Sequence, residues 1–269
     1  MSRHPVRASA GATLPVQADQ AAGLRRLFAG RQCQFVPLVA NPYVTYASVL
    51  LERLTTALAQ ARIPVLLVDA AETSPKPPDV ATIDLAACIE QLDPYTAYLA
   101  GRGLPRAHVD TRGNASRLLP ALSNAAPGAR VIFVHGEAND LARVFQGVDA
   151  RPMLLAADRV DAVKHAYAAA KVLVQRAGLM TYDLIMSAPQ GSRRARAIAS
   201  SLADTIERYL SALLADWAQI DPSADVADAP GDDLQRLLLR QIQLGMPDAP
   251  AAIAPRSAEA QITVFAATN

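Results

Sequence analysis

One strand–helix–strand segment constrains the fold of this chain more than any other part of its sequence. It contains two short apolar runs, Phe35–Ala40 and Pro64–Asp69, which are typical of buried strands. The stretch between them, Tyr46–Ala61, has apolar residues at helical spacing. Two strands joined by one helix form a βαβ unit, whose crossover is expected to be right-handed. Ligands of such sheets bind beyond the carboxyl ends of the strands, so we expect a nucleotide site near the turn after Ala40 and near Asp69.

Strand and helix signals continue to alternate along the rest of the chain. Further strands are predicted at Ala129–Val134, Arg151–Ala157, Tyr182–Met186 and, as an edge strand, Trp217–Ile220. Further helices are predicted at Thr82–Leu92, Asn114–Ala125 with Asn114 as its cap, Asn139–Phe145, Asp158–Ala177 and Gly191–Ala215. This alternation predicts an α/β fold, a doubly wound and mostly parallel sheet with helices on both faces.

The N-terminal region differs in composition from the domain that follows. Residues 1–18 lack periodicity and are predicted to be a disordered tail. Residues 19–30 are predicted to form a short helix that Asp19 caps. Such a short helix is marginal alone, so it either packs on the domain or folds on a partner. The α/β domain itself is expected to span residues 31–220.

The C-terminal region is expected to add one helix to this domain. Residues 221–231 are acidic and rich in Pro and Ala, as in a linker, and residues 245–269 form an Ala- and Pro-rich tail. Between them, residues 232–244 predict an amphipathic helix with two arginines. Docking on the domain is the favoured interpretation of this helix. The alternative is peripheral contact with a membrane surface.

Composition excludes several classes of protein. A length of 269 residues with 51% hydrophobic residues is enough for a substantial core. The formal net charge of +1 argues against a broad nucleic-acid interface, and nucleic acid is not expected among the partners. No apolar run approaches the roughly 18 residues of a membrane span, and no secretory signal is evident. A cytoplasmic location is therefore expected.

The turn after the first strand lacks the chemistry of a phosphate-binding loop. Such a loop needs glycines whose backbone N–H groups converge on the phosphates, a lysine, and a Ser or Thr for Mg²⁺. Residues 40–48 contain neither glycine nor lysine, and Pro42 removes a backbone donor. Tyr43 and Tyr46 would crowd a triphosphate. Only Ser48 remains as a hydroxyl for a metal ion.

His135 ends the third strong strand, where a nucleotide hydrolase would have a metal-linked carboxylate. A structural or vestigial histidine is the favoured interpretation, because no nucleophile or second histidine is placed with it. An enzyme that uses His135 as a base is the least favoured. No hydrolytic triad, paired catalytic carboxylates or metal-binding cluster stands out, so no catalytic residue and no metal ligand is predicted.

The peptide Asp19-Gln20-Ala21-Ala22-Gly23-Leu24-Arg25-Arg26-Leu27 resembles the DQAxGLRRL motif that opens the bacterial flagellar regulators of the FlhG (FleN, YlxH) family. Residues 56–59 and 65–69 resemble the family's "ALA…VLLVDAD" stretch, and residues 151–171 resemble its "TDAYALIK" helix. The resemblance covers roughly residues 18–215.

This resemblance implies a MinD/ParA-like P-loop fold and a role in flagellar number or placement. In the family, the N-terminal peptide stimulates the GTPase FlhF, and the ATPase domain dimerises on ATP and binds the inner face of the membrane through a C-terminal helix. The residues that match the activator motif are Asp19, Gln20, Ala21, Leu24 and Arg25. ATP and Mg²⁺ are implied as cofactors by the family alone.

The nucleotide site departs from the family at most of its positions. Pro42 and Ala47 replace the two lysines of the family's phosphate-binding loop, and His135 replaces the acid of the Walker B strand. Asp69 matches the first acid after the second strand, and Ser48 matches the Mg²⁺-binding hydroxyl. With Asn41 these positions form a vestigial nucleotide site at Asn41, Pro42, Ala47, Ser48, Asp69 and His135. A pseudo-ATPase is therefore expected.

Three functions stay open. The first is a MinD-like scaffold whose N-terminal peptide stimulates FlhF without ATP hydrolysis. The second is a nucleotide switch that binds ATP through an unusual loop. The third is a binding module for another flagellar partner, either the flagellar C-ring or a flagellar transcription regulator.

Overall fold

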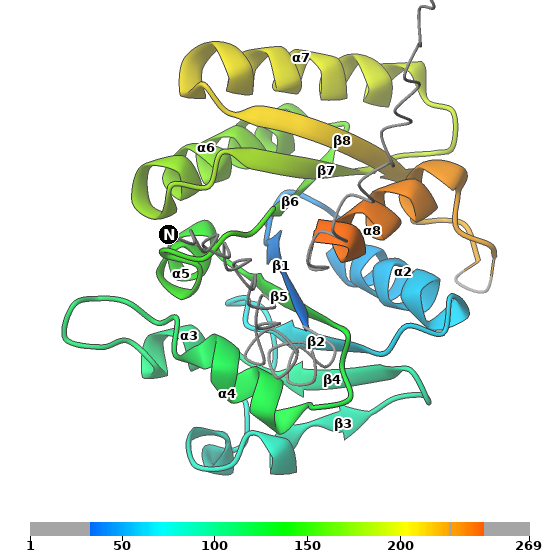
Figure 1. The fold of residues 1–269 in the computed structure, drawn as a ribbon. Helices are drawn as coiled ribbons and strands as arrows, with labels where there is room; N and C mark the ends of the chain where they lie inside the picture. The colour runs from blue at the N-terminus through cyan, green and yellow to red at the C-terminus, as the bar shows by residue number, and fades with distance from the viewer. Residues whose placement is uncertain (1–32, 226–227, 245–269) are drawn as a thin grey trace, which may run out of the picture.

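A computed structural model describes residues 33–225 and 228–244 of the chain (Figure 1). Within these residues, eight strands form one sheet in the order β3-β4-β2-β5-β1-β6-β7-β8. Every neighbouring pair is parallel except β3 and β4. The strands are β1 Gln34–Val39, β2 Val65–Asp69, β3 Glu90–Gln91, β4 Thr96–Ala100, β5 Val131–Gly136, β6 Met153–Ala157, β7 Thr181–Ser187 and β8 Leu213–Ile220. The predicted fold class is confirmed.

Helices cover both faces of this sheet (Figure 1). They are α2 Ala47–Gln60, α3 Leu104–Ala107, α4 Leu118–Ala125, α5 Ala138–Val144, α6 Val160–Ala177, α7 Arg193–Leu210 and α8 Asp232–Leu244. The crossover from β1 to β2 runs toward the β3 edge, whereas those from β4 through β8 run toward the β8 edge. Because crossovers share one hand, opposite directions place the helices on opposite faces. Accordingly α2 packs on one face, and α4 to α7 pack on the other.

Alternation along the strands builds the two halves of the core. In β2, Val65 and Leu67 point to the face that α2 covers, whereas Leu66 and Val68 point to the opposite face. All four side chains are buried. A strand buried on both faces has a continuous apolar sequence, which is why a buried strand could be predicted here from the sequence.

The prediction of a helix at Thr82–Leu92 is wrong. This segment forms two short 3-10 turns, at Asp79–Thr82 and Ala86–Cys88, followed by β3. The Asp84 carboxylate accepts a hydrogen bond from the Ala87 N–H, a local contact that competes with helix formation. Ile83 is 89% exposed, so little apolar burial favours a helix here. Strand β4, which was not predicted, follows directly and pairs with β2.

Two other helices have different ends from those predicted. The Asn114 side chain accepts from the Ser116 N–H in a turn, and α4 begins only at Leu118. Helix α7 begins after Ser192, whose hydroxyl accepts from the Ala195 N–H. It ends at Leu210, because Ser211 adopts a left-handed conformation, and β8 follows where helix was expected to continue to residue 215.

Helix α8 packs beside α2 and against β8 and β1 (Figure 1). Leu234, Leu237 and Leu238 are buried in the core on this face. The residues before it are held by Arg53 of α2, whose guanidinium donates to the carbonyls of Asp225 and Asp228. None of the helices in the described residues is long and apolar enough to cross a membrane.

A buried polar cluster fixes α8 to the sheet. The Asp183 carboxylate, which is fully buried in β7, pairs with Arg151 at 2.8 Å and accepts a hydrogen bond of 2.7 Å from the Gln241 amide of α8. The same amide donates to the Arg151 carbonyl. Burial raises the pKa of Asp183, and the positive charge of Arg151 opposes that rise. The position of α8 therefore depends on a charge that Arg151 compensates.

We expect Arg151→Leu to reduce the free energy of unfolding by about 3–5 kcal/mol, because it leaves the Asp183 charge buried without its partner. Urea denaturation followed by circular dichroism measures the change. Arg176→Leu, which removes an exposed arginine of α6, is the control and should change stability by no more than about 0.5 kcal/mol. Equal stabilities of the two variants would contradict this assignment.

Candidate functional site

The carboxyl ends of the central parallel strands bring the predicted site residues to one edge of the sheet. Strand β1 lies between β5 and β6, and β5 lies between β1 and β2. The loop that joins β1 to α2 therefore emerges between the ends of β5 and β6, and β2 ends one strand farther away. Asp69 and His135 are directly opposite each other in the β2–β5 pairing. Parallel α/β sheets bind their ligands at this edge.

The β1–α2 loop is anchored by Asn41. Its side-chain amide donates to the Leu155 carbonyl of β6 at 2.8 Å and to the Ala162 carbonyl of α6 at 2.9 Å. Its side-chain oxygen accepts from the Tyr43 N–H at 3.1 Å. Asn41 is 4% exposed, so these bonds satisfy groups that water does not reach. The loop is thus closed against β6 and α6 by its own side chain.

The remaining loop residues present no phosphate cradle. Pro42 and Tyr43 are exposed, and Tyr46 is 65% exposed. Tyr46 also has a φ of 63° at the start of α2, a left-handed conformation that costs a non-glycine residue roughly 1–3 kcal/mol. A phosphate-binding loop uses glycine where its backbone must turn in this way. Ala47 is half-buried, and Ser48 is exposed on the first turn of α2.

Asp69 and His135 form a buried pair. Nδ1 of His135 lies 2.7 Å from Oδ1 of Asp69, and both side chains are largely shielded from water. Burial alone would raise the pKa of Asp69. Hydrogen bonds from His135 and Ser74, the charge of His135, and a bond from the Ala71 N–H together bring this pKa below its usual range. Nε2 of His135 is buried and has no hydrogen-bond partner among the described residues.

The structure adds three residues that the sequence did not predict. Tyr98 of β4 lies next to Asp69, and burial, the charges of Asp69 and Glu90, and a hydrogen bond to Asp69 raise its pKa. Beyond β5, a carboxylate oxygen of Glu137 accepts from the Glu72 N–H at 2.9 Å. Only Glu137 had a local signal, because it is an acid that directly follows a strand.

His165 is the third addition. The ring of Tyr43 packs edge-on against it, with centroids 5.9 Å apart. Burial lowers the pKa of His165, and the negative charge of Glu137 opposes this shift. The residue lies on α6, far along the chain from the loop that it contacts, so its role was not visible in the sequence.

These side chains do not fit Mg²⁺ and a nucleoside triphosphate. The loop offers no lysine, Pro42 offers no N–H, and the Asn41 amide is already bonded to protein carbonyls. The Asp69 carboxylate, which could help to bind Mg²⁺, is bonded to a histidine instead. Among the described residues, no group of three or more His, Cys, Asp or Glu side chains could hold a metal ion.

A cavity of about 510 Å³ lies near this edge but is not formed by the β1–α2 loop. Its lining comes from the segments that follow β2, β4 and β5, and includes Glu72, Arg106 and Asp140. Arg106 joins Glu72 at 2.8 Å and Asp140 of α5 at 3.2 Å. Ion pairs thus connect α3 with α5 beside the site. The predicted partner-binding residues Asp19, Gln20, Ala21, Leu24 and Arg25 lie outside the described residues.

We expect Asn41→Ala to lower the free energy of unfolding by about 2–4 kcal/mol, because two buried carbonyls lose their donor. Chemical denaturation measures the loss. The matched control is Asn139→Ala, which removes an exposed asparagine of α5 and should be nearly neutral. A cost for Asn41→Ala no larger than that of the control would show that the loop does not depend on these bonds.

Asp69 should contribute an acid-sensitive part of the stability. Its pKa in the folded chain lies below the ordinary value of 3.8. The ionised carboxylate therefore stabilises the fold above that value, and this contribution is lost as the pH falls from 3.8 through the folded pKa. The stability difference between the wild-type chain and Asp69→Asn should narrow over this acid range. Exposed Asp161→Asn is the control, and a difference that stays constant on acidification would contradict the assignment.

No protein-family model and no curated protein sequence matches this chain. Solved structures do match its fold. The MinD cell division protein of Aquifex aeolicus aligns with a TM-score of 0.55 and 11% identity, over 80% of this chain and 99% of that one. A putative plasmid partition protein of Borrelia burgdorferi bound to AMPPNP aligns with a TM-score of 0.56 and 11% identity, over 80% and 100%.

Cobyrinic acid a,c-diamide synthase of Mycobacterium smegmatis, with bound ADP and magnesium, aligns with a TM-score of 0.56 and 15% identity, over 80% of this chain and 97% of that one. Identities this low show similarity of fold alone. The chain therefore shares its α/β fold with MinD and with these two other proteins.

Proposed function

We propose that this chain is a MinD-like scaffold that regulates flagellar biosynthesis and does not hydrolyse ATP. The observation that supports this most directly is the β1–α2 loop. In this loop Asn41 bonds to protein carbonyls, and a proline and tyrosines stand where a phosphate-binding loop has glycines and lysine. Positioning and charge stabilisation are almost the whole of phosphoryl-transfer catalysis. A loop with neither lysine nor glycine supplies little of either.

Solved structures of the same fold support the contrast. The putative plasmid partition protein is bound to AMPPNP, and the diamide synthase contains ADP and magnesium. At the corresponding edge of this chain, Asp69 is paired with His135. A further structure of this fold is the MinC:MinD complex of Aquifex aeolicus, which aligns with a TM-score of 0.51 and 12% identity. A domain of this kind can therefore hold a partner protein, as a scaffold requires.

The partner that we propose is a FlhF-type GTPase. Its binding residues would be Asp19, Gln20, Ala21, Leu24 and Arg25, which match the activator peptide of the FlhG family. The scaffold then acts in the cytoplasm, at or near the inner face of the cell membrane. It controls the number or placement of flagella by stimulating GTP hydrolysis on its partner.

An ATP-binding switch is the second candidate function. Ser48 is exposed on the first turn of α2, and Asp69 stands at the end of β2, as a magnesium site of this fold would require. Nucleotide binding that is lost in both Ser48→Ala and Asp69→Asn would establish this candidate. The binding-module function would be favoured by a different result. In a binding assay with this chain as bait, a flagellar transcription regulator would be recovered and a GTPase would not.

One pair of measurements tests the main proposal. Isothermal titration with Mg²⁺·ATP and Mg²⁺·ADP should give no binding heat, because the loop cannot neutralise the phosphates. The same preparation should raise the GTP hydrolysis rate of a FlhF-type GTPase. Leu24→Ala with Arg25→Ala should abolish the stimulation, whereas Lys76→Ala, an exposed change outside the motif, should leave it intact.

The outcomes separate the candidates. Stimulation that survives Leu24→Ala with Arg25→Ala would exclude the peptide as activator. Micromolar binding of ATP would show that the β1–α2 loop still accepts phosphates, and would make the chain a nucleotide-dependent switch.

A further inference from the structure

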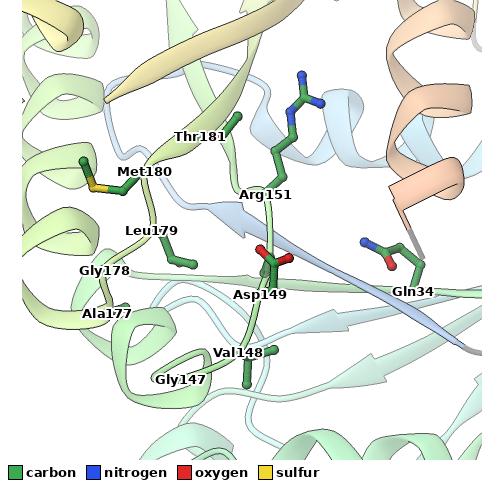
Figure 2. Close-up of a pocket in the computed structure, with 11 residues that line it drawn as sticks. Gln34, Gly147, Val148, Asp149, Arg151, Ala177, Gly178, Leu179, Met180 and Thr181 are labelled. Atoms are coloured by element: carbon green, nitrogen blue, oxygen red, sulfur yellow. The ribbon is translucent and has the colours of Figure 1, made fainter. Parts of the chain in front are cut away.

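A second cavity lies at the opposite edge of the sheet, where the strands begin. It has a volume of about 480 Å³, within the roughly 300–1,000 Å³ of pockets that bind ligands. Three separate segments form it, as Figure 2 shows: Gln34 at the start of β1, the run 147–151 before β6, and the run 177–181 between α6 and β7. None of the predicted nucleotide-site residues belongs to it. We call this feature the basal pocket.

The basal pocket combines exposed backbone, apolar side chains and one acid. Gly147 and Gly178 have left-handed φ values of 74° and 70°, and a side chain added at either would meet no atom within 4 Å. Both turns therefore leave open space beside the backbone. Leu179 is buried at the wall, and Met180, although apolar, is 41% exposed. Met180 thus offers an apolar contact to a ligand in the pocket.

Of the two charged side chains that line the basal pocket, the one outside the ion pairs of the described residues is an acid. Arg151 lines it, but its guanidinium is paired with Asp183 at 2.8 Å. Asp149 also lines it and is exposed, and it takes part in none of the ion pairs found among the described residues. A ligand with apolar and cationic groups would match this combination.

The N-terminal segment of the same chain has these groups and is tethered at the pocket. The described chain begins at Cys33, and the next residue, Gln34, is part of the lining. Five residues, 29–33, separate Phe28 from Gln34, so the Cα atoms of Phe28 and Gln34 lie at most about 22 Å apart. Residues 19–32 contain three arginines and one aspartate, with Leu24, Leu27 and Phe28 as large apolar residues. A short tether of this kind gives an effective concentration of the order of millimolar.

We propose that residues 19–32 bind the basal pocket of their own chain, with Phe28 beside Met180 and an arginine near Asp149. This docking would also have a regulatory consequence, which rests on the proposed function. Leu24 and Arg25 belong to the activator motif, so a docked segment withholds them from the GTPase. Stimulation then requires that the segment leave the basal pocket.

Disulfide trapping in the full chain tests the docking without reference to activity. In a background with Cys33→Ser and Cys88→Ser, the pair Phe28→Cys and Met180→Cys should form an intramolecular disulfide under mild oxidation. Cysteines must approach to a Cα separation of about 7 Å or less to be bridged. The control is Phe28→Cys with Ile83→Cys, because Ile83 is 89% exposed and lies outside the pocket. Cross-linking of the test pair should exceed the control at least tenfold.

Charge reversal gives an independent comparison. Asp149→Lys in the test pair should reduce the cross-linking rate several-fold, because it places like charges together. Glu207→Lys makes the same charge change at an exposed position of α7 and should leave the rate unchanged. Cross-linking no faster than the control pair, disulfides only between two chains, or equal rates for these two variants would each overturn the proposal.

The cross-linked chain also separates this inference from the proposed function. Oxidised, it should stimulate the GTPase at least tenfold less than the same chain after reduction. If the disulfide forms but neither the oxidised nor the reduced chain stimulates the GTPase, the docking is supported and the proposed GTPase function is rejected. Equal stimulation in both states would reject the regulatory consequence.

Discussion

The position of β1 in the centre of the sheet determines where everything else in this structure can lie. It hydrogen-bonds to β5 on one side and β6 on the other, although both strands come much later in the chain. With crossovers of one hand, this arrangement sends α2 to one face and the later helices to the other. It also places the β1–α2 loop between the ends of β5 and β6, one strand away from β2. Both cavities described above are consequences of this order, one at each end of the strands.

The β1–α2 loop at the carboxyl edge lacks the chemistry of a phosphate-binding loop. A phosphate-binding loop keeps its backbone donors free for a ligand. Here the Asn41 side chain accepts a hydrogen bond from the Tyr43 N–H and also ties the loop to carbonyls of β6 and α6. The acid that remains at the end of β2 is hydrogen-bonded to the histidine opposite it. Polar groups that would serve a ligand are thus used to hold neighbouring elements together.

Much of the fold could be predicted from the sequence, because its central strands are buried on both faces and are apolar throughout. The segments 82–92 and 96–100 could not. The apolar residues of segment 82–92 fit helical spacing, but only Leu85 of that helical face is buried. Segment 96–100 is recognisable as a strand, β4, only through its pairing with β2. The site residues divide in the same way. Asp69 and His135 stand at predicted strand ends, whereas Tyr98 and His165 reach the site through strand order and helix packing, which no local pattern encodes.

The hydrogen bonds of the Gln241 amide affect the order in which parts of this protein can fold during synthesis. It bonds to the carbonyl of Arg151, 90 positions earlier, and to the side chain of Asp183, 58 positions earlier. Chains fold in the direction of synthesis, and contacts between distant positions form late. On the ribosome, β1 to β8 would be complete while the face beside α2 was still open and the Asp183 carboxylate lacked one donor. The last described helix therefore completes the core, and a nascent chain stalled before residue 232 would present apolar surface to chaperones.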